Sequence, residues 1–430
     1  MTIVIDARCV SDELSGIDRY VLGVIEGLAS VRPPETIRVL GKAVRPLLKL
    51  TDHHGAPDLV ECDLPMWSLR AHHKVPALLK KLGTEVYHCP YLYAPLLGRG
   101  YATVVTAHDL IPHVRRREFQ RSRKSRFFPV WNAWFRAQCA KADAIVTVSD
   151  FSKQQLMDIA RLPESRLHRI YNGAKPSREG IAEDELRRRY GLRGRLVSYV
   201  GRHDPHKGID DLVTAFAQLI QRLPADDEVT LVVGGRLDPR YPEARRMAKA
   251  LNLQDRVVFT GYLQDDERVA LVRASSVFAY PSHHEGFGLP PLEALSEGTP
   301  VVAYDATSLP EVLGDAALLV PDSPDALCAG MQRLLTDRKL AAALALAGPR
   351  RAANFDWTRC ALEHLDVYRA VAAPSRSRPP RTVSAPAPSV ANGQLHGKLN
   401  GAHVNGHASA PARGQRVPHD RTADQHVEAG

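Results

Sequence analysis

Short apolar runs rich in β-branched residues alternate along this chain with longer amphipathic runs. The short runs have the length of strands, and the longer runs have the apolar spacing of helices. In the first half the strand-like runs lie at 2–7, 36–41, 85–90, 102–109, 144–150 and 166–173. In the second half they lie at 196–201, 229–235, 256–262, 277–282 and 299–305. This alternation predicts an α/β fold of two Rossmann-like, doubly wound lobes with parallel sheets.

The amphipathic runs between these segments predict helices. Residues 16–29 carry apolar side chains on one helical face, and another helix is expected at about 210–223. Ser152 and Gln155 have the spacing of a capping box, which predicts that a helix starts at Ser152. A further helical pattern occupies 357–371.

Composition changes mark the limits of the predicted domains. A polar, charged stretch begins near Lys175, where we place the linker, so the domains are expected at 1–175 and 176–356. From about residue 372 the chain is rich in Pro, Ser, Ala, Gly, Asn and His and poor in large apolar residues. Such a segment cannot bury enough surface to offset its ordering entropy, so 372–430 is predicted to be a disordered tail.

The overall composition is that of an ordinary globular protein. With 430 residues, 44% hydrophobic and 24% charged, the chain is long enough for two domains. It has no run of about 18 apolar residues and no secretory signal pattern, so neither a membrane span nor export is expected. The six cysteines form no CxxC pair, which indicates neither a zinc site nor a disulfide framework and favours the cytosol. The net charge of +9 leaves anionic small molecules, membranes and nucleic acids open as partners.

The first candidate site is a loop and helix start between two predicted strands, at 283–303. Two prolines at 290–291 suit the first turn of a helix, and Gly298 suits its C-terminal end. Glu285 then lies in the loop and Glu293 about one turn inside the helix, with seven residues between them. The loop glycines allow close backbone approach and a helix start binds anions, so the segment suits a phosphate with nearby hydroxyls. The alternative is a helix start whose acidic residues are favoured only by the helix dipole.

A second charged loop, 201–208, follows the first predicted strand of the second half. Arg202 and Lys207 lie there at the carboxyl edge of the sheet, where open α/β sheets bind ligands. Two cations at this edge suit a diphosphate, arginine through forked hydrogen bonds and lysine as a point charge. The alternative is a solvated polar loop.

Taken in order, several segments resemble glycosyltransferase family 4, a retaining family of GT-B fold. In the second half these are GRHDPHKG (201–208), FTGYL (259–263), PSHHEGFGLPPLEALSEGTPVVAYD (281–305) and LPEVLGDAALLV (309–320). In the first half they are SGIDRY (15–20), HCPYLYAP (88–95), TAHDLIP (106–112), VTVSDFS (146–152) and YNGA (171–174). The resemblance covers about residues 1–371 and is strongest to the mannosyltransferase-like bacterial branch that builds surface polysaccharides. It also implies that the helix at 357–371 crosses back to the first domain.

The resemblance implies a role for each matched residue. Glu285 and His108 are the candidate catalytic residues, which would lie beside the transferred sugar from the two sides of a cleft. The candidate donor-binding residues are Gly16, Arg202, Lys207, Gly286, Phe287, Gly288, Leu289 and Glu293. Arg202 and Lys207 would contact the pyrophosphate, Glu293 the ribose hydroxyls, and the backbone of 286–289 the sugar and diphosphate. Asp18 stands where many relatives have a second glycine, and a lone histidine at a strand end such as His108 is often structural.

The implied reaction is transfer of a hexose, first mannose, from a nucleotide-diphosphate sugar to a glycan or lipid-linked glycan. GDP-mannose is the first expected donor and a UDP-sugar the second. No acidic DxD cluster follows a predicted strand, so transfer without a metal or other cofactor is expected. The alternatives are a non-catalytic nucleotide-sugar-binding partner of another transferase and a nucleotide-sugar epimerase of the same fold. A dinucleotide oxidoreductase is disfavoured because no GxGxxG follows a first strand.

A basic stretch at 115–126 is followed directly by aromatic residues up to Phe135. Basic and aromatic residues together suit an anionic membrane surface or a single-stranded nucleic acid. The alternative is a solvated loop followed by an amphipathic helix whose aromatic side chains pack inward. With a lipid-linked acceptor, peripheral membrane contact through 115–135 is the preferred hypothesis. The expected location is the cytoplasm, at the inner face of the membrane, without a nucleic-acid partner.

Overall fold

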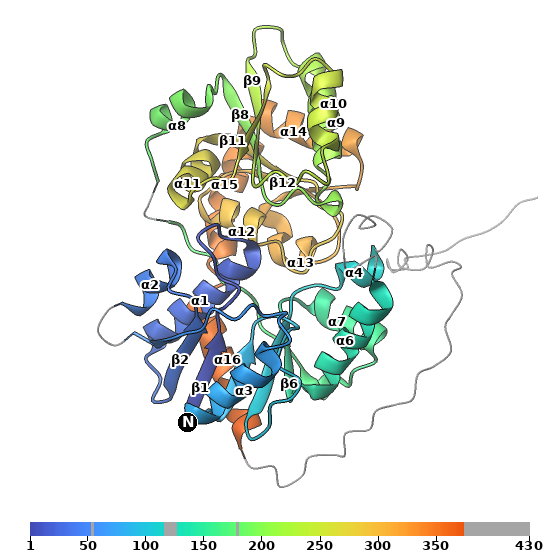
Figure 1. The fold of residues 1–430 in the computed structure, drawn as a ribbon. Helices are drawn as coiled ribbons and strands as arrows, with labels where there is room; N and C mark the ends of the chain where they lie inside the picture. Colours follow the sequence, from blue (N-terminus) through green and yellow to red (C-terminus); the bar gives the residue numbers. More distant parts are fainter. Residues whose placement is uncertain (53–55, 116–126, 178–179, 374–430) are drawn as a thin grey trace, which may run out of the picture. The chain divides into compact units, whose positions relative to one another are not determined.

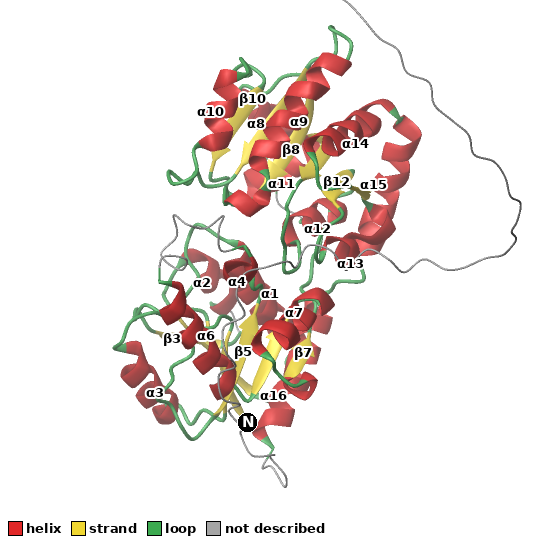
Figure 2. Cartoon of the chain, turned by 90° about the vertical axis from the view of Figure 1, so that its right-hand side faces the viewer, coloured by secondary structure: helices red, strands yellow, loops and turns green. Residues whose placement is uncertain are grey.

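The protein is described from a computed structural model, which covers residues 1–52, 56–115, 127–177 and 180–373. The predicted disordered tail lies outside the described residues, apart from its first two positions. Two parallel sheets form the framework, and each is packed between helices (Figures 1 and 2). We call the part built on the first sheet, sheet A, the first lobe, and the part built on the second, sheet B, the second lobe.

Sheet A has seven parallel strands in the order β3-β2-β1-β4-β5-β6-β7. The strands are β1 (Thr2–Asp6), β2 (Thr36–Gly41), β3 (Asp58–Glu61), β4 (Val86–Cys89), β5 (Ala102–Ala107), β6 (Ala144–Thr147) and β7 (Leu167–Arg169). Strands β4, β5 and β6 are buried along their whole length, as expected for the centre of a sheet covered on both faces.

Sheet B has six parallel strands in the order β10-β9-β8-β11-β12-β13. The strands are β8 (Arg195–Val200), β9 (Val229–Gly234), β10 (Val257–Gly261), β11 (Ser275–Tyr280), β12 (Val301–Tyr304) and β13 (Leu318–Val320). Both sheets therefore confirm the predicted pair of doubly wound folds. The pattern did not predict β3 or β13, because one is a partly polar edge strand and the other has three residues.

The helices of the first lobe are α1 (Gly16–Val31), α2 (Arg45–Thr51), α3 (Ala71–Lys81), α4 (Ile111–Val114), α6 (Phe128–Lys141) and α7 (Asp150–Ala160). Those of the second are α8 (Glu183–Tyr190), α9 (Ile209–Arg222), α10 (Glu243–Ala250), α11 (Asp265–Ala274), α12 (Leu289–Ser296), α13 (Leu309–Leu313), α14 (Pro324–Thr336) and α15 (Arg338–Ala352). Short 3₁₀ turns lie at η1 (Glu164–Arg166), η2 (Pro205–Lys207) and η3 (Gly314–Ala316).

The predicted start of helix α7 is wrong. The helix begins at Asp150, and its N-cap is Ser149, whose hydroxyl oxygen accepts a hydrogen bond from the Ser152 amide at 3.0 Å. Both serines have capping chemistry, so the spacing from Ser152 to Gln155 pointed to a start one turn too late. Ser152 instead lies inside the first turn and is buried.

The last helix, α16 (Trp357–Ala372), follows the second-lobe helix α15 in sequence but packs on α1 and contacts β4 and β5 (Figure 1). Two glycines of α1 allow this close packing. A Cβ at Gly27 would lie 2.2 Å from the Trp357 carbonyl oxygen, and one at Gly23 would lie 2.3 Å from the Trp357 ring. The chain thus returns to the first lobe through α16. The domain limits at 1–175 and 176–356 stay a prediction.

Candidate active site

Two loops meet where the strand order of sheet B reverses. The loop 201–208 follows β8, and the loop 281–288 follows β11, its neighbour in the sheet. The carboxyl ends of parallel strands lie at one edge, and a crevice opens where consecutive connections leave to opposite faces. The two charged segments selected from the sequence are therefore adjacent in space.

Lys207 and Glu285 form the centre of this site. The Lys207 ammonium lies 2.5 Å from Glu285 Oε1, and the Tyr280 hydroxyl donates to the same oxygen at 2.8 Å. The two charged side chains are only 12% and 9% exposed. Burial, followed by the charge of Glu285, raises the pKa of Tyr280 well above its usual value, so the phenol stays a hydrogen-bond donor.

Arg202 and Lys207, which were predicted to act together on a diphosphate, do not share a partner. Lys207 binds Glu285, whereas Arg202 donates from Nε to Asp204 Oδ2 in its own loop at 2.7 Å. The Arg202 side chain is 64% exposed. The structure thus gives each cation its own carboxylate, with the lysine buried in the site and the arginine at its exposed edge.

The loop 286–289 presents its backbone rather than its side chains. Phe287 and Leu289 are buried, and the Phe287 ring packs against Phe355. Gly288, with φ of 98°, is the N-cap of α12, a conformation that suits glycine. The prolines at 290–291 carry no N–H, so anion binding at this helix start rests on the amides before them. Within this segment the predicted anion site is therefore limited to the amides of the loop 286–289.

Glu293 belongs to a charged chain that the sequence reasoning missed. It lies in the middle of α12, where Oε2 accepts from Arg268 Nη1 at 2.7 Å. Arg268 also lies 3.7 Å from Asp265, which forms an ion pair with Arg19 of α1. The adjacent loop adds a hydrogen bond from the Leu14 amide to Tyr262 at 2.7 Å. Arg19 is part of the SGIDRY motif, and this was the available signal.

The start of α1 explains the unusual residue at position 18. Asp18 and Ser15 form a capping box, in which the Ser15 amide donates to Asp18 Oδ2 at 2.7 Å and the Asp18 amide donates to Ser15 Oγ at 3.4 Å. Asp18 is only 4% exposed, and this burial raises the pKa of its carboxyl group. A Cβ on Gly16 would meet nothing within 4 Å. The aspartate thus fixes the helix start, and the space beside Gly16 stays open.

His108 follows β5 and is held by its own lobe. Its Nε2 lies 2.9 Å from the Pro90 carbonyl oxygen, and its ring makes a T-shaped contact with Tyr20, with centroids 4.7 Å apart. Because a carbonyl only accepts, Nε2 carries the proton and Nδ1 is the acceptor. Burial lowers the pKa of His108, which favours the neutral ring. His108 therefore has the structural role that was the alternative in the sequence analysis. Its Nδ1 keeps a lone pair that can accept a hydrogen bond.

Behind His108 lies a buried chain of hydrogen bonds that anchors α16. His364 Nδ1 lies 2.7 Å from the Cys360 carbonyl oxygen, so it must donate there, which leaves Nε2 as an acceptor. The Tyr20 hydroxyl, 2.9 Å away, therefore donates to Nε2 and must accept from Thr106 at 2.8 Å. One carbonyl thereby sets the tautomer of His364 and the direction of the chain.

The chain continues to β4 with the same logic. Because the Thr106 proton points to Tyr20, its oxygen accepts from His88 Nε2 at 2.8 Å. His88 Nδ1 is then an acceptor for the Tyr368 hydroxyl at 2.7 Å. Both histidines are fully buried and neutral, because burial lowers the pKa of His364 to about 4 and that of His88 well below its usual value.

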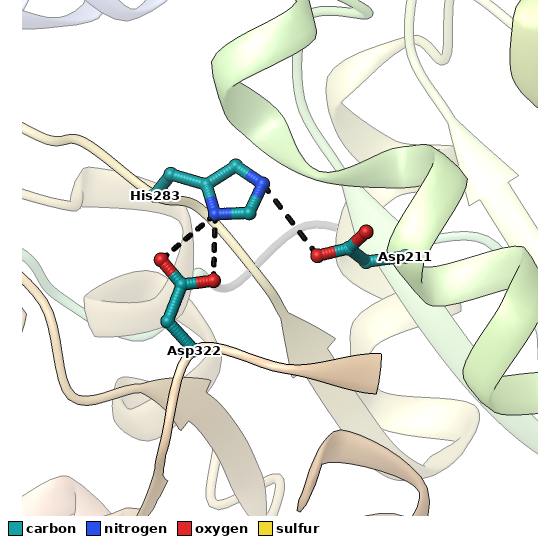
Figure 3. A group of neighbouring side chains, drawn as sticks. All are labelled: Asp211, His283 and Asp322. Atoms are coloured by element: carbon teal, nitrogen blue, oxygen red, sulfur yellow. Dashed lines mark hydrogen bonds and ion pairs between the residues drawn. The ribbon is translucent and has the colours of Figure 1, made fainter. Parts of the chain in front are cut away.

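His283, beside Glu285, lies between two carboxylates (Figure 3). Its Nδ1 is 2.7 Å from Asp322 Oδ1, and its Nε2 is 3.5 Å from Asp211 Oδ2. Among the described residues, these three side chains are close enough together for a metal ion. The two ring nitrogens, however, face carboxylates on different sides of the ring, as Figure 3 shows. The hydrogen bonds to Asp322 orient the ring, and metal-independent transfer stays a prediction.

The aromatic residues after the basic stretch divide between core and surface. Residues 116–126 lie outside the described residues. In α6, Phe135 is buried with Trp131 stacked on it at 5.9 Å, and Trp134 donates to the Leu92 carbonyl at 2.9 Å. Phe127 and Val130 are 58% and 71% exposed. In the described residues no helix is both long and apolar enough to span a membrane.

Two family models match the chain in succession. Glycosyltransferase Family 4 matches residues 14–178, and Glycosyl transferases group 1 matches residues 183–351. The O-antigen chain mannosyltransferase B of Escherichia coli is 27% identical over 406 residues, 86% of this chain and 100% of that protein. The serotype-specific mannosyltransferase WbdA of Escherichia coli is 30% identical over 275 residues, 61% of this chain but 32% of that protein.

A solved structure gives the class of fold. Anabaena Alr3699/HepE in complex with UDP-glucose has a TM-score of 0.67 at 20% identity, over 86% of this chain and 100% of that one. Two Rossmann-like lobes with parallel sheets give the chain the GT-B fold. The chain belongs to glycosyltransferase family 4 and is an enzyme of the hexosyltransferase class.

Proposed function

We propose that this enzyme transfers mannose, with retention of configuration, from a nucleotide-diphosphate sugar to a glycan or lipid-linked glycan in surface polysaccharide biosynthesis. The observation that carries the proposal is the buried Lys207–Glu285–Tyr280 cluster beside the backbone loop 286–289. The names of the two mannosyltransferase relatives support mannose and the polysaccharide, so GDP-mannose is the first donor. The complex of Alr3699/HepE with UDP-glucose makes a UDP-sugar the second.

The charges of the site suit the departure of a nucleoside diphosphate. Lys207 has three N–H donors and gives one to Glu285 and a longer one, 3.4 Å, to the Tyr280 hydroxyl, so a donor remains for phosphate. Arg202 at the exposed edge and the amides of 286–289 would add further donors. Preorganised donors of this kind stabilise the charge that develops on a leaving group.

Two carboxylates and one histidine are assigned to the sugars. Glu285 would lie beside the transferred sugar, and the acceptor Nδ1 of His108 would accept a sugar hydroxyl from the first lobe. A carboxylate accepts about four hydrogen bonds, so the pairing of Glu293 with Arg268 leaves capacity for the ribose hydroxyls. Gly16 would leave room for the diphosphate, since nothing lies within 4 Å of its Cβ position.

The test is release of nucleoside diphosphate from a panel of GDP- and UDP-sugars, with a crude lipid-linked glycan extract as acceptor. We expect release from GDP-mannose by the wild type, loss of release in Glu285→Ala, and normal release in the exposed control Glu164→Ala. Conversion of the nucleotide sugar into another one would instead indicate an epimerase. Binding of a donor without turnover would indicate a non-catalytic partner.

We also propose peripheral contact with the inner face of the membrane through 115–135, in a cytoplasmic enzyme. The exposed Phe127 and Val130 support this contact, whereas the inward packing of Phe135 removes that residue from it. Co-sedimentation with vesicles that contain or lack anionic lipid tests the idea. Equal recovery with both vesicle types would argue against it, and so would an unchanged result after Phe127→Ser.

A further inference from the structure

The first turn of α7, in the first lobe, is joined to the candidate donor loop of the second. Ser149 is fully buried, and its oxygen accepts from the Ser152 amide at 3.0 Å, which caps the helix. Its hydroxyl proton is therefore free to point elsewhere, and it donates to the Gly286 carbonyl at 2.6 Å. One side chain thus starts a helix in one lobe and holds a loop of the other.

Ser152 makes a second connection at the same carbonyl. Its hydroxyl lies 3.2 Å from the Gly286 oxygen and 3.3 Å from the His108 oxygen. A hydroxyl has one proton, so the two carbonyls share it. Ser152 is 2% exposed, so water does not easily replace these bonds. Its hydroxyl joins the two segments that would face the transferred sugar from opposite lobes.

Gly286 has no space for a side chain at this contact. A Cβ on Gly286 would lie 1.7 Å from the His108 carbonyl oxygen and 3.3 Å from Asp109 Cβ. The two backbones therefore touch directly, and the serine hydroxyls lie beside that contact.

Glu311 of α13 binds the same helix start from the second lobe. Its carboxylate accepts from the Asp150 amide at 2.7 Å and from the Phe151 amide at 3.1 Å. These first-turn amides have no partner within the helix, and the helix dipole favours a carboxylate there. Arg351 of α15 donates to the Glu311 carbonyl at 2.6 Å, which fixes α13 to its own lobe.

We infer that Ser149, Ser152 and Glu311 are positioning residues that set the loop 286–289 against His108, so that transfer occurs only when the lobes are in contact. This inference rests on the proposed function. The nucleotide-binding side chains Arg202, Lys207 and Glu293 all lie in the second lobe, so a loosened contact keeps most of nucleotide binding and weakens only the contribution of the amides of 286–289. Misplacement of the loop reduces the rate of transfer instead, since an error of about 1 Å can cost about 100-fold.

The cleanest variants are Ser152→Ala, which keeps the Ser149 cap, and Glu311→Ala, with Glu311→Gln as the conservative variant that keeps an acceptor oxygen. The matched control is Ser323→Ala, since Ser323 caps α14 within the second lobe by accepting from the Ala326 amide at 3.2 Å. Each full-length variant is assayed for kcat and KM with GDP-mannose, for GDP affinity by calorimetry, and for hydrogen exchange of the 283–292 segment.

For Ser152→Ala and Glu311→Ala we expect kcat to fall about tenfold or more, GDP affinity to fall by much less than kcat, and exchange of the loop to rise. Glu311→Gln should recover part of kcat, and Ser323→Ala should resemble the wild type. If the first two variants match Ser323→Ala in kcat and in loop exchange, the positioning role is overturned. If the wild type turns over no donor, the proposed function is wrong. Unchanged hydrogen exchange of the loop in the variants overturns the positioning role independently of that result.

Discussion

Sheet A places β1 beside β4, and sheet B places β8 beside β11, at the same topological position, where the strand order reverses. In sheet A this position is filled by a closed set of groups. Asp6 accepts from Arg8 Nε at 2.8 Å and Nη2 at 2.6 Å, and Tyr87 of β4 donates a further hydrogen bond to the same carboxylate. Both charged side chains are completely buried.

In sheet B the side chains at the equivalent position keep hydrogen-bonding capacity that they do not use with one another. Lys207 and Glu285 are 12% and 9% exposed, whereas the pair in sheet A is not exposed at all, and Arg202 is 64% exposed on its loop. The reversal of strand order therefore occurs in both sheets, and the side chains at each reversal decide what that position does. In the first lobe they satisfy one another and support the fold, whereas in the second they keep the donors that we propose for a phosphate.

Breaking the closed set in the first lobe should have the largest effect on stability. Asp6→Asn leaves Arg8 as a buried charge without its counterion, which costs about 3–5 kcal/mol of unfolding free energy. Urea denaturation measures this loss, and GDP affinity of the folded variant should be unchanged. A loss below about 1 kcal/mol, or a loss of GDP affinity, would show that the two positions do not differ as described.

The corresponding change in the second lobe should act on the reaction. Lys207→Ala removes the buried cation, and we expect transfer to slow by about 100- to 1000-fold. The free energy of unfolding should drop less than in Asp6→Asn, because Glu285 keeps the Tyr280 hydrogen bond and some solvent contact. Initial rates at saturating donor test this, with the exposed Lys175→Ala as control. A decrease below threefold would remove Lys207 from the mechanism.

The buried histidines of the first lobe predict a pH dependence of stability. Burial lowers the pKa of His364 to about 4, whereas an unfolded histidine titrates near 6.5. The unfolded chain therefore binds more protons below pH 6.5, and stability declines as pH falls from about 6.5 towards 4. Unfolding midpoints at pH 7, 6 and 5 measure the slope. His364→Gln should reduce the slope without abolishing it, since burial also lowers the pKa of His88, and an equal slope in that variant would contradict the assignment.

The smallest effects come from removing one hydroxyl in each lobe. Tyr20→Phe leaves His364 Nε2 without its donor, so it should cost about 1–3 kcal/mol of stability with little change in turnover per folded molecule. Tyr280→Phe removes a donor from Glu285 and should lower kcat several-fold with a smaller loss of stability. Thermal melts and initial rates on both variants separate the two outcomes. Reversed effects would mean that the roles of the lobes are exchanged.

Much of the fold could be predicted from local patterns. The run 36–41 is β2 without change, and 16–29 is α1 shortened by two residues at its C-terminal end. The start of α7 was misplaced by one turn, because Ser149 and Ser152 have the same capping chemistry and only the backbone shows which one caps. The strand β13 was missed because three residues carry too little pattern.

The candidate site was predicted in part. Glu285, Lys207 and the loop 286–289 could be selected because charge, glycine spacing and a family pattern coincide in short segments. The partner of Glu293 could not, because Arg268 lies 25 positions away on another helix. The pairing of Arg202 with Asp204 rather than with Lys207 was likewise beyond the pattern, since loop geometry selects among neighbouring charges.

The alternation of elements, the two-lobed fold and the location of the charged loops follow from periodicity and from contacts within a few residues, so they could be predicted from the sequence. The links between distant segments could not: these are the Asp6–Arg8–Tyr87 set, the directed chain from Cys360 to Tyr368, and the hydrogen bonds of Ser149 and Glu311 between the lobes. The difference lies in the range of the interactions. A hydrogen bond needs its atoms within about 3 Å, and which distant residues come that close depends on how the whole chain packs.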